Sequence, residues 1–255
     1  MVKGLAIFKE FFEAYADQYV LIGGTAASLT MEDAGLEFRA TKDLDLVLIV
    51  EALSAEFGRR FWAFIEAGRY EIREASQTGK PILYRFQKPN DTTYPFMLEL
   101  FCRTPDGLTL GEGSHLTPIP LAEAVSSLSA ILLDDEYYAF ILGGRRLMNG
   151  LTYVGEDRLI PLKACAWLEL NARRANGESV DSGNIRKHLN DVLRLSQLLA
   201  STSSIPISGR IADDMRTFVT AVQGDASLNP KTVGLKATVA EICGRLSRAY
   251  GLETA

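Results

Sequence analysis

The chain has 255 residues, of which 47% are hydrophobic and 23% are charged, and its formal net charge is −5. This composition is typical of a folded globular protein with one large domain or two smaller ones. The acidic balance argues against a protein that coats nucleic acid, because phosphate binding depends on lysine and arginine. The net negative charge is still compatible with a local basic patch that binds RNA.

No apolar run approaches the roughly 20 residues that cross a bilayer, and the N-terminus lacks the apolar stretch of a secretory signal. Three cysteines are widely spaced, at Cys102, Cys165 and Cys243, and the only histidines are His115 and His188. This spacing matches no zinc-binding pattern, so we expect the cysteines to be reduced core residues of a cytoplasmic protein. From the lack of a long apolar run we expect no contact with a membrane.

The first 155 residues mix helical and strand patterns. Apolar residues at helical spacing predict an amphipathic helix within residues 2–18. An apolar run over 19–22 predicts a buried strand that ends at a glycine pair, and the small residues 25–30 favour a helix directly after it. Residues 43–50 predict a second strand, followed by a helix over 54–67 that Ser54 caps.

Aromatic and aliphatic residues then predict two strands and one helix, over residues 81–87, 95–103 and 121–133. Residues 136–142 and 146–154 flank Gly143-Gly144 and are expected to form a hairpin or a short strand pair. Beyond about residue 156 the periodicity is helical only, over 162–175, 184–200, 208–222 and 231–250. The sequence therefore predicts an α/β (α+β) domain over 1–155 and a helical domain over 156–255.

Three features of the first domain can carry chemistry. The first is Gly23-Gly24-Thr25, between a predicted strand and a predicted helix. Glycines let a phosphate approach the backbone closely, and the free N–H groups at a helix start attract anions. Taken alone, a glycine pair is also compatible with an ordinary turn.

The second feature is Asp43-Leu44-Asp45. Residues i and i+2 of a strand point to one face, about 6 to 7 Å apart, so these two carboxylates can converge on Mg²⁺. The competing interpretation is a half-exposed strand whose acids face water.

The third feature is Glu99, which lies inside the apolar run over residues 96–101. A carboxylate in a buried strand needs a cation nearby. That cation is either a metal ion or an arginine, unless the side chain faces solvent.

In combination, the three features resemble the nucleotidyltransferase superfamily, in which a Gly-Gly or Gly-Ser turn precedes an acid-x-acid strand and a third acid follows. The residues Arg39-x-Thr41-x-Asp43-Leu44-Asp45 are similar to the motif of the AbiEii/AbiGii-type nucleotidyltransferase toxins of bacterial toxin–antitoxin and phage-defence systems. The resemblance covers residues 19 to about 195. It implies a nucleotidyltransferase-like mixed sheet with flanking helices, and a C-terminal helical domain.

The same branch has a second motif, with a lysine that leads a helix, an arginine two to three turns later and a Lys-Asp-x-x-Asp segment. The corresponding residues here are Lys163, Arg173-Arg174, Lys187 and Asp191. His188 departs from the motif, because it stands where the branch has an aspartate. We expect His188 to be a surface or packing residue.

The resemblance implies a Mg²⁺-dependent transfer of a nucleoside monophosphate from an NTP to an acceptor hydroxyl. Asp43, Asp45 and Glu99 would hold two Mg²⁺ ions, and Glu99 is also a candidate base for the attacking hydroxyl. Nucleotide-binding roles fall on Gly23, Gly24, Thr25, Arg39, Lys163 and Asp191. Arg39 would contact phosphate or pair with an acid, and Asp191 would orient Lys163, the base or the ribose.

The acceptor could be a tRNA 3′ end, a protein or a small molecule, and a cognate antitoxin is a conceivable partner. One alternative is an antibiotic nucleotidyltransferase for an aminoglycoside or lincosamide, since an acidic protein suits a cationic drug. Another is a non-catalytic relative that binds a nucleotide or a partner. Arg145-Arg146 and Arg173-Arg174 would form either a basic patch for RNA or a solvated surface.

Overall fold

The computed structural model describes residues 2–72, 82–102 and 134–252, so the helix predicted over 121–133 lies outside the described residues. The chain divides into two compact units. One consists of residues 1–133 and 142–155, and the other of residues 134–141 and 156–255. The predicted continuous division at residue 155 places 134–141 in the first unit, whereas the contacts of this segment place it in the second.

The first unit is built on a mixed sheet with the strand order β3-β4-β5-β2-β1-β7-β6. The strands are β1 (Tyr19–Ile22), β2 (Asp43–Leu48), β3 (Glu71–Ile72), β4 (Ile82–Gln87), β5 (Met97–Cys102), β6 (Arg145–Met148) and β7 (Leu151–Val154). β2 pairs with β5 and β1 pairs with β7 in parallel, and the other neighbours are antiparallel. The predicted α+β class with a mixed sheet is thereby confirmed.

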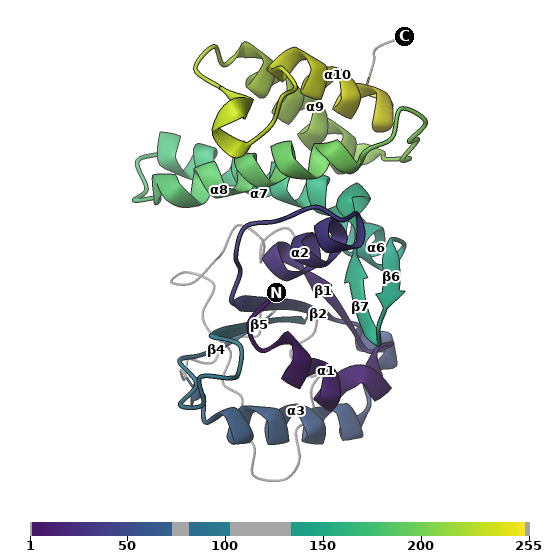
Figure 1. The fold of residues 1–255 in the computed structure, drawn as a ribbon, viewed down its shortest axis with the longest axis vertical. Coiled ribbons are helices and arrows are strands. Elements are labelled where there is room, and N and C mark those ends of the chain that lie inside the picture. Colours follow the sequence, from purple (N-terminus) through teal and green to yellow (C-terminus); the bar gives the residue numbers. More distant parts are fainter. Residues whose placement is uncertain (1, 73–81, 103–133, 253–255) are drawn as a thin grey trace. The chain divides into compact units, whose positions relative to one another are not determined.

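One face of this sheet carries an aromatic core. The helices α1 (Leu5–Phe12) and α3 (Ala55–Gly68) lie on that face, and Figure 1 shows both of them on the side of the sheet away from α2. Phe8 packs edge-on against Tyr19 of β1, and Phe61 packs against Phe86 of β4. As predicted, Ser54 caps α3, since its hydroxyl accepts a hydrogen bond from the Phe57 N–H at 3.1 Å.

The opposite face is covered along β1 and β2 by α2 (Gly23–Asp33), which starts where β1 ends. The two glycines are already part of this helix, so the helix begins earlier than the predicted residue 25. The N-terminal helical segment is shorter than predicted, because α1 ends at Phe12 and a 3₁₀ turn follows over Glu13–Tyr15.

The segment that starts at residue 134 departs from the predicted strand pair. Residues Asp135–Leu142 form a helix, α6, and the hairpin is made by β6 and β7 around Asn149 and Gly150, both with positive φ. The side chain of Asp134 explains the helix start, because its Oδ1 accepts from the N–H groups of Glu136 and Tyr137 at 2.9 and 3.2 Å.

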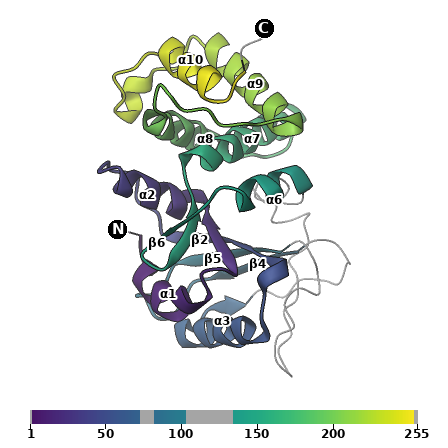
Figure 2. The same ribbon diagram turned by 90° about the vertical axis from the view of Figure 1, so that its right-hand side faces the viewer.

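The contacts of the chain place α6 in the second unit with four longer helices, and Figure 2 shows these longer helices lying together. They are α7 (Glu156–Ala175), α8 (Ser182–Leu195), α9 (Gly209–Gly224) and α10 (Val239–Ala249). Cys165 and Cys243 are buried free thiols in this core. No helix within the described residues is long and apolar enough to cross a membrane.

Candidate functional site

The turn from β1 into α2 requires glycine at its first position. Gly23 has φ of +64°, and a Cβ atom there would lie 1.9 Å from Oδ2 of Asp45. Ile22 at the helix N-cap forms no side-chain capping hydrogen bond. The helix start therefore places backbone N–H groups beside a carboxylate from the neighbouring strand.

Thr25 ties this helix to β2. Its hydroxyl is fully buried and donates to the carbonyl oxygen of Asp43 at 2.8 Å. The Thr25 side chain is thus used to hold α2 against β2, so a contact of Thr25 with phosphate would have to come from its N–H group.

The two aspartates of β2 lie on the α2 face of the sheet. Asp43 and Asp45 are half-buried, whereas Leu44 and Leu46 between and after them are fully buried on the aromatic face. The register places Asp45 opposite Ile22 of β1. Asp43 and Asp45 therefore share one face of β2, with the Asp45 carboxylate at Gly23 and the Asp43 carbonyl oxygen at Thr25. Their convergence on a metal ion stays a prediction.

Glu99 lies in the same row of the sheet. Its Cα is the register partner of Asp45 in the parallel pair β2–β5, where strands are about 4.8 Å apart. Its carboxylate is buried and is held by Arg85, the register partner on β4. Nε of Arg85 donates to Oε1 of Glu99 at 2.7 Å, and Nη2 forms a salt bridge to the same oxygen.

An arginine partner for Glu99 was one of the alternatives that the sequence left open, but the sequence did not identify Arg85. The signal was present, since Arg85 is the one charged residue of the strand over residues 82–87. Pairing it with Glu99 required the strand register, which a single sequence does not contain.

Arg39 and Thr41 complete the surroundings of the glycine turn. A Cβ on Gly24 would lie 2.8 Å from Oγ1 of Thr41 and 3.5 Å from Nη2 of Arg39. Both side chains are half-buried. The structure thus brings the Arg39 guanidinium beside the helix start.

The donor set suits Mg²⁺ in part. Carboxylate oxygens of Asp43 and Asp45 are the hard ligands that Mg²⁺ takes, usually one or two of them together with substrate phosphates. No group of three or more Asp, Glu, His or Cys side chains in the described part of the chain is arranged to hold a metal ion. The pair of aspartates fits a cation shared with phosphate, whereas Glu99 is engaged by Arg85.

Lys163 and Asp191 meet in the core of the helical unit. Nζ of Lys163 lies 2.8 Å from Oδ2 of Asp191, and their side chains are 4% and 0% exposed. Arg194 approaches the other oxygen at 4.0 Å. This contact joins α7 to α8, and the role of Asp191 in orienting Lys163 for a nucleotide stays a prediction.

The other singled-out residues take part in local contacts. Arg173 forms an ion pair with Glu178 at 2.7 Å, and Arg174 donates to Asn171 at 3.0 Å. The Arg145 Nε donates to the carbonyl oxygen of Leu142 at 3.0 Å. His188 is half-buried on α8.

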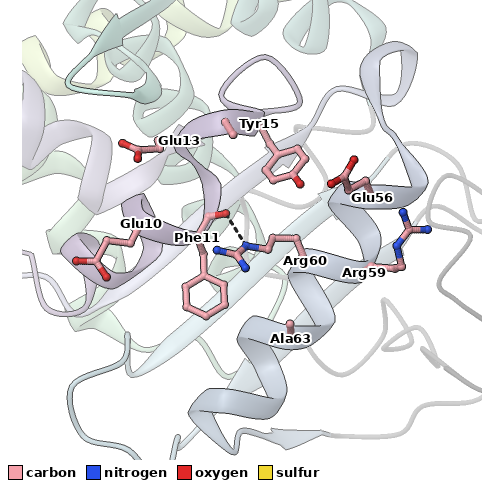
Figure 3. A pocket seen from close by; sticks show the side chains of 9 residues that line it. Glu10, Phe11, Glu13, Tyr15, Glu56, Arg59, Arg60 and Ala63 are labelled. Carbon is pink, nitrogen blue, oxygen red and sulfur yellow. Dashed lines mark hydrogen bonds between the residues drawn. The ribbon is translucent and has the colours of Figure 1, made fainter.

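A cavity of about 430 Å³ lies between α1 and α3, on the aromatic side of the sheet (Figure 3). Its wall mixes Glu10, Glu13 and Glu56 with two arginines. The Arg60 guanidinium lies 4.4 Å from the Phe11 ring centre, and its Nε donates to the Phe11 carbonyl oxygen at 3.1 Å. This arginine thus joins the two helices, and the cavity contains none of the predicted site residues.

No protein-family model and no curated protein matches the sequence. Among solved structures, the chain is similar to one described as the crystal structure of the Megavirus polyadenylate synthase, with 12% sequence identity and a TM-score of 0.40. The match covers 87% of this chain and 36% of that one, so this chain spans about a third of the length of that protein. A likeness this weak assigns neither a family nor an activity to the chain.

Proposed function

We propose that the chain is a Mg²⁺-dependent nucleotidyltransferase that moves a nucleoside monophosphate from an NTP to an acceptor hydroxyl. The observation that carries the proposal is the position of the Asp45 carboxylate against Gly23 at the start of α2. A helix start that binds phosphate and a carboxylate that binds a cation are thereby within one small site.

Each group at this site has a role in that reaction. The N–H groups of Gly23, Gly24 and Thr25 would bind the β- and γ-phosphates, and the Arg39 guanidinium would add a charge-assisted contact. Asp43 and Asp45 would hold Mg²⁺, whose charge would offset that of the triphosphate and stabilise the attacking and leaving oxygens.

Lys163 and Asp191 enter the proposal as one unit. Burying a charged group is costly unless it is paired, and Asp191 pairs with Lys163 at 2.8 Å. Nucleotide binding is the role that we propose for Lys163, with Asp191 as the residue that orients it.

The resemblance of Arg39-x-Thr41-x-Asp43-Leu44-Asp45 to the toxin motif favours a toxin or phage-defence role, with a tRNA 3′ end or a protein as acceptor. A cognate antitoxin would be the expected regulator. Because we expect a cytoplasmic protein, the acceptor would be sought in a cytoplasmic extract.

Transfer of α-³²P-labelled NTP tests this proposal, with each of the four NTPs offered to total tRNA and to total protein. Wild type is expected to label one fraction with a preferred NTP, and Asp45→Asn to reduce labelling by at least about 100-fold, as expected for loss of charge stabilisation. Asp17→Asn, at an exposed acid of the same unit, is the matched control and should label normally. Equal labelling by Asp45→Asn and wild type would refute the proposed site.

A further inference from the structure

A row of charged side chains crosses three strands on the α2 face of the sheet. Arg85 of β4, Glu99 of β5 and Asp45 of β2 are successive register partners. Strands in a sheet lie about 4.8 Å apart, so Glu99 stands between a guanidinium on one side and an aspartate on the other. The cation that neutralises Glu99 in this row is a side chain of the protein itself.

The contact of Arg85 with Glu99 is close and partly shielded from water. Two nitrogens of the guanidinium, Nε and Nη2, meet the single oxygen Oε1, and the two side chains are 24% and 7% exposed. Charge-assisted hydrogen bonds are shorter and stronger than neutral ones, and removing one partner of a buried ion pair is costly. A metal ion that took the same oxygen would have to displace the guanidinium or bind beside another positive charge.

We propose that Arg85 is a positioning residue that keeps Glu99 out of metal coordination, so that Asp43 and Asp45 bind the divalent cation without it. The inference rests on the proposed function, and it reduces the ligand set that the family resemblance implies from three carboxylates to two. Glu99 then acts as the buried counterion that joins β4 to β5 beside the site. The nucleotide phosphates would complete the coordination of the cation.

Binding of Mn²⁺ alone, followed by the EPR signal of the free ion, tests the ligand set without any assay of activity. We expect Asp45→Asn to weaken binding at least about tenfold and Glu99→Gln to change it less than about threefold, since affinity follows the number of charged ligands. Glutamine keeps an oxygen that can accept from Arg85, so the fold is preserved in the decisive variant. A loss with Glu99→Gln as large as that with Asp45→Asn would overturn the inference.

Releasing Glu99 from Arg85 provides the opposite test. In Arg85→Met the carboxylate is free to reach a cation, and Mn²⁺ affinity is expected to rise more than about threefold. The gain should vanish in the double variant Arg85→Met/Glu99→Gln, which removes both charges and avoids an unpaired buried carboxylate. A gain that persists in the double variant would contradict the proposed role of Arg85. Circular dichroism verifies the fold of each variant.

The two proposals fail in different ways. If wild type and Asp45→Asn bind Mn²⁺ equally weakly, the metal site is absent and the proposed function falls with it. If Asp45→Asn and Glu99→Gln both abolish binding, the metal site stands with three carboxylates and only the inference about Arg85 is overturned.

Discussion

Gly23 is constrained by its backbone and by its neighbour at the same time. Its φ of +64° favours glycine, and the space that a side chain would occupy is filled by the Asp45 carboxylate. Gly35, just beyond the other end of the same helix, has a φ of +70°, but a Cβ there would meet nothing within 4 Å. Both positions therefore need a positive φ, but only Gly23 has a neighbouring side chain in the space of a Cβ atom.

The change Gly23→Ala is therefore expected to destabilise the first unit more than Gly35→Ala does. A left-handed conformation costs an alanine about 1 to 2 kcal/mol at either site, and only at Gly23 must a carboxylate move as well. Urea unfolding gives the two free energies, and calorimetry with Mg²⁺·NTP gives nucleotide affinity. Affinity should fall in Gly23→Ala alone. Equal unfolding free energies and equal nucleotide affinities of the two variants would show that the contact with Asp45 affects neither stability nor binding.

The ion pair of Lys163 and Asp191 permits a separation of stability from function. Removing one partner, as in Lys163→Met, leaves a buried charge and should cost about 3 to 5 kcal/mol of unfolding free energy. The double variant Lys163→Met/Asp191→Leu replaces the pair by apolar groups and should recover most of that stability. If the pair serves nucleotide binding, the double variant stays inactive in the transfer assay. Recovered activity would assign the pair to the fold alone.

At the scale of elements, β1, β2, β4 and β5 were predictable because their apolar runs are short and bounded by glycine, proline or polar residues. β3 was not predicted, and residues 146–154 form a hairpin where one strand of a pair was expected. The location of Asp43 and Asp45 on one face followed from the period of two in a strand. The helix α6 was not predicted, since residues 136–142 carry the aromatic and aliphatic side chains that favour strands. Tyr137 and Ile141 are buried four residues apart, which is helical spacing, and tertiary contacts decide the outcome.

The register is the part of the site that the sequence does not contain. Glu99 was recognisable as a carboxylate that needs a cation, yet the choice between a metal ion and an arginine depends on which residue of β4 stands opposite it. That pairing joins residues 14 apart through long-range strand contacts. The residues of each strand alone do not determine this register.

The helix α7 carries a carboxyl group whose protonation should influence the stability of the helical unit. The pKa of Glu169 is raised from 4.5 to about 7, mainly by burial and also by the nearby Asp214 carboxylate, against the opposing effect of Arg210 and Arg173. Between pH 4.5 and 7 the folded state thus binds more protons than the unfolded state. Stability is expected to fall as the pH rises through this window and to level off above it.

Urea unfolding of the full chain at about pH 5 and about pH 7.5 measures this effect. The loss attributable to Glu169 should be about 1 to 2 kcal/mol, below the full linkage because the side chain is 24% exposed. Glu169→Gln should remove that part of the slope. Asp213→Asn, at an acid that is 75% exposed in the same unit, is the control and should retain it. An unchanged slope in Glu169→Gln would contradict the assignment.

At the scale of the whole molecule, the chain passes from the first unit to the second and back before it completes the sheet. Residues 134–141 belong with the helical unit, although the chain then returns to the sheet for β6 and β7. Arg210 of α9 fixes this segment, since its Nη1 lies 2.9 Å from Asp134 and its backbone N–H donates to Glu136 at 3.0 Å. The Tyr137 hydroxyl adds a bond to Asp214 at 2.8 Å.

These contacts predict that α6 opens together with the helical unit and not with the sheet to which its neighbours in sequence belong. Native-state hydrogen exchange at increasing urea concentration measures the opening free energy of each amide. The amides of Tyr138 and Ile141 should converge with those of α7 and α9. In Arg210→Gln their exchange should accelerate by about tenfold or more, which corresponds to about 1.4 kcal/mol, while β1 and β2 keep their rates.

Arg216→Gln is the matched control for that experiment. Arg216 lies on the same helix and pairs at 2.9 Å with the exposed Asp213, three residues away, so its loss should leave α6 unaffected because exposed pairs contribute little. If the α6 amides instead follow β6 and β7 in every variant, the segment opens with the sheet. The placement of residues 134–141 in the helical unit would then reflect their contacts but not the units in which the chain unfolds.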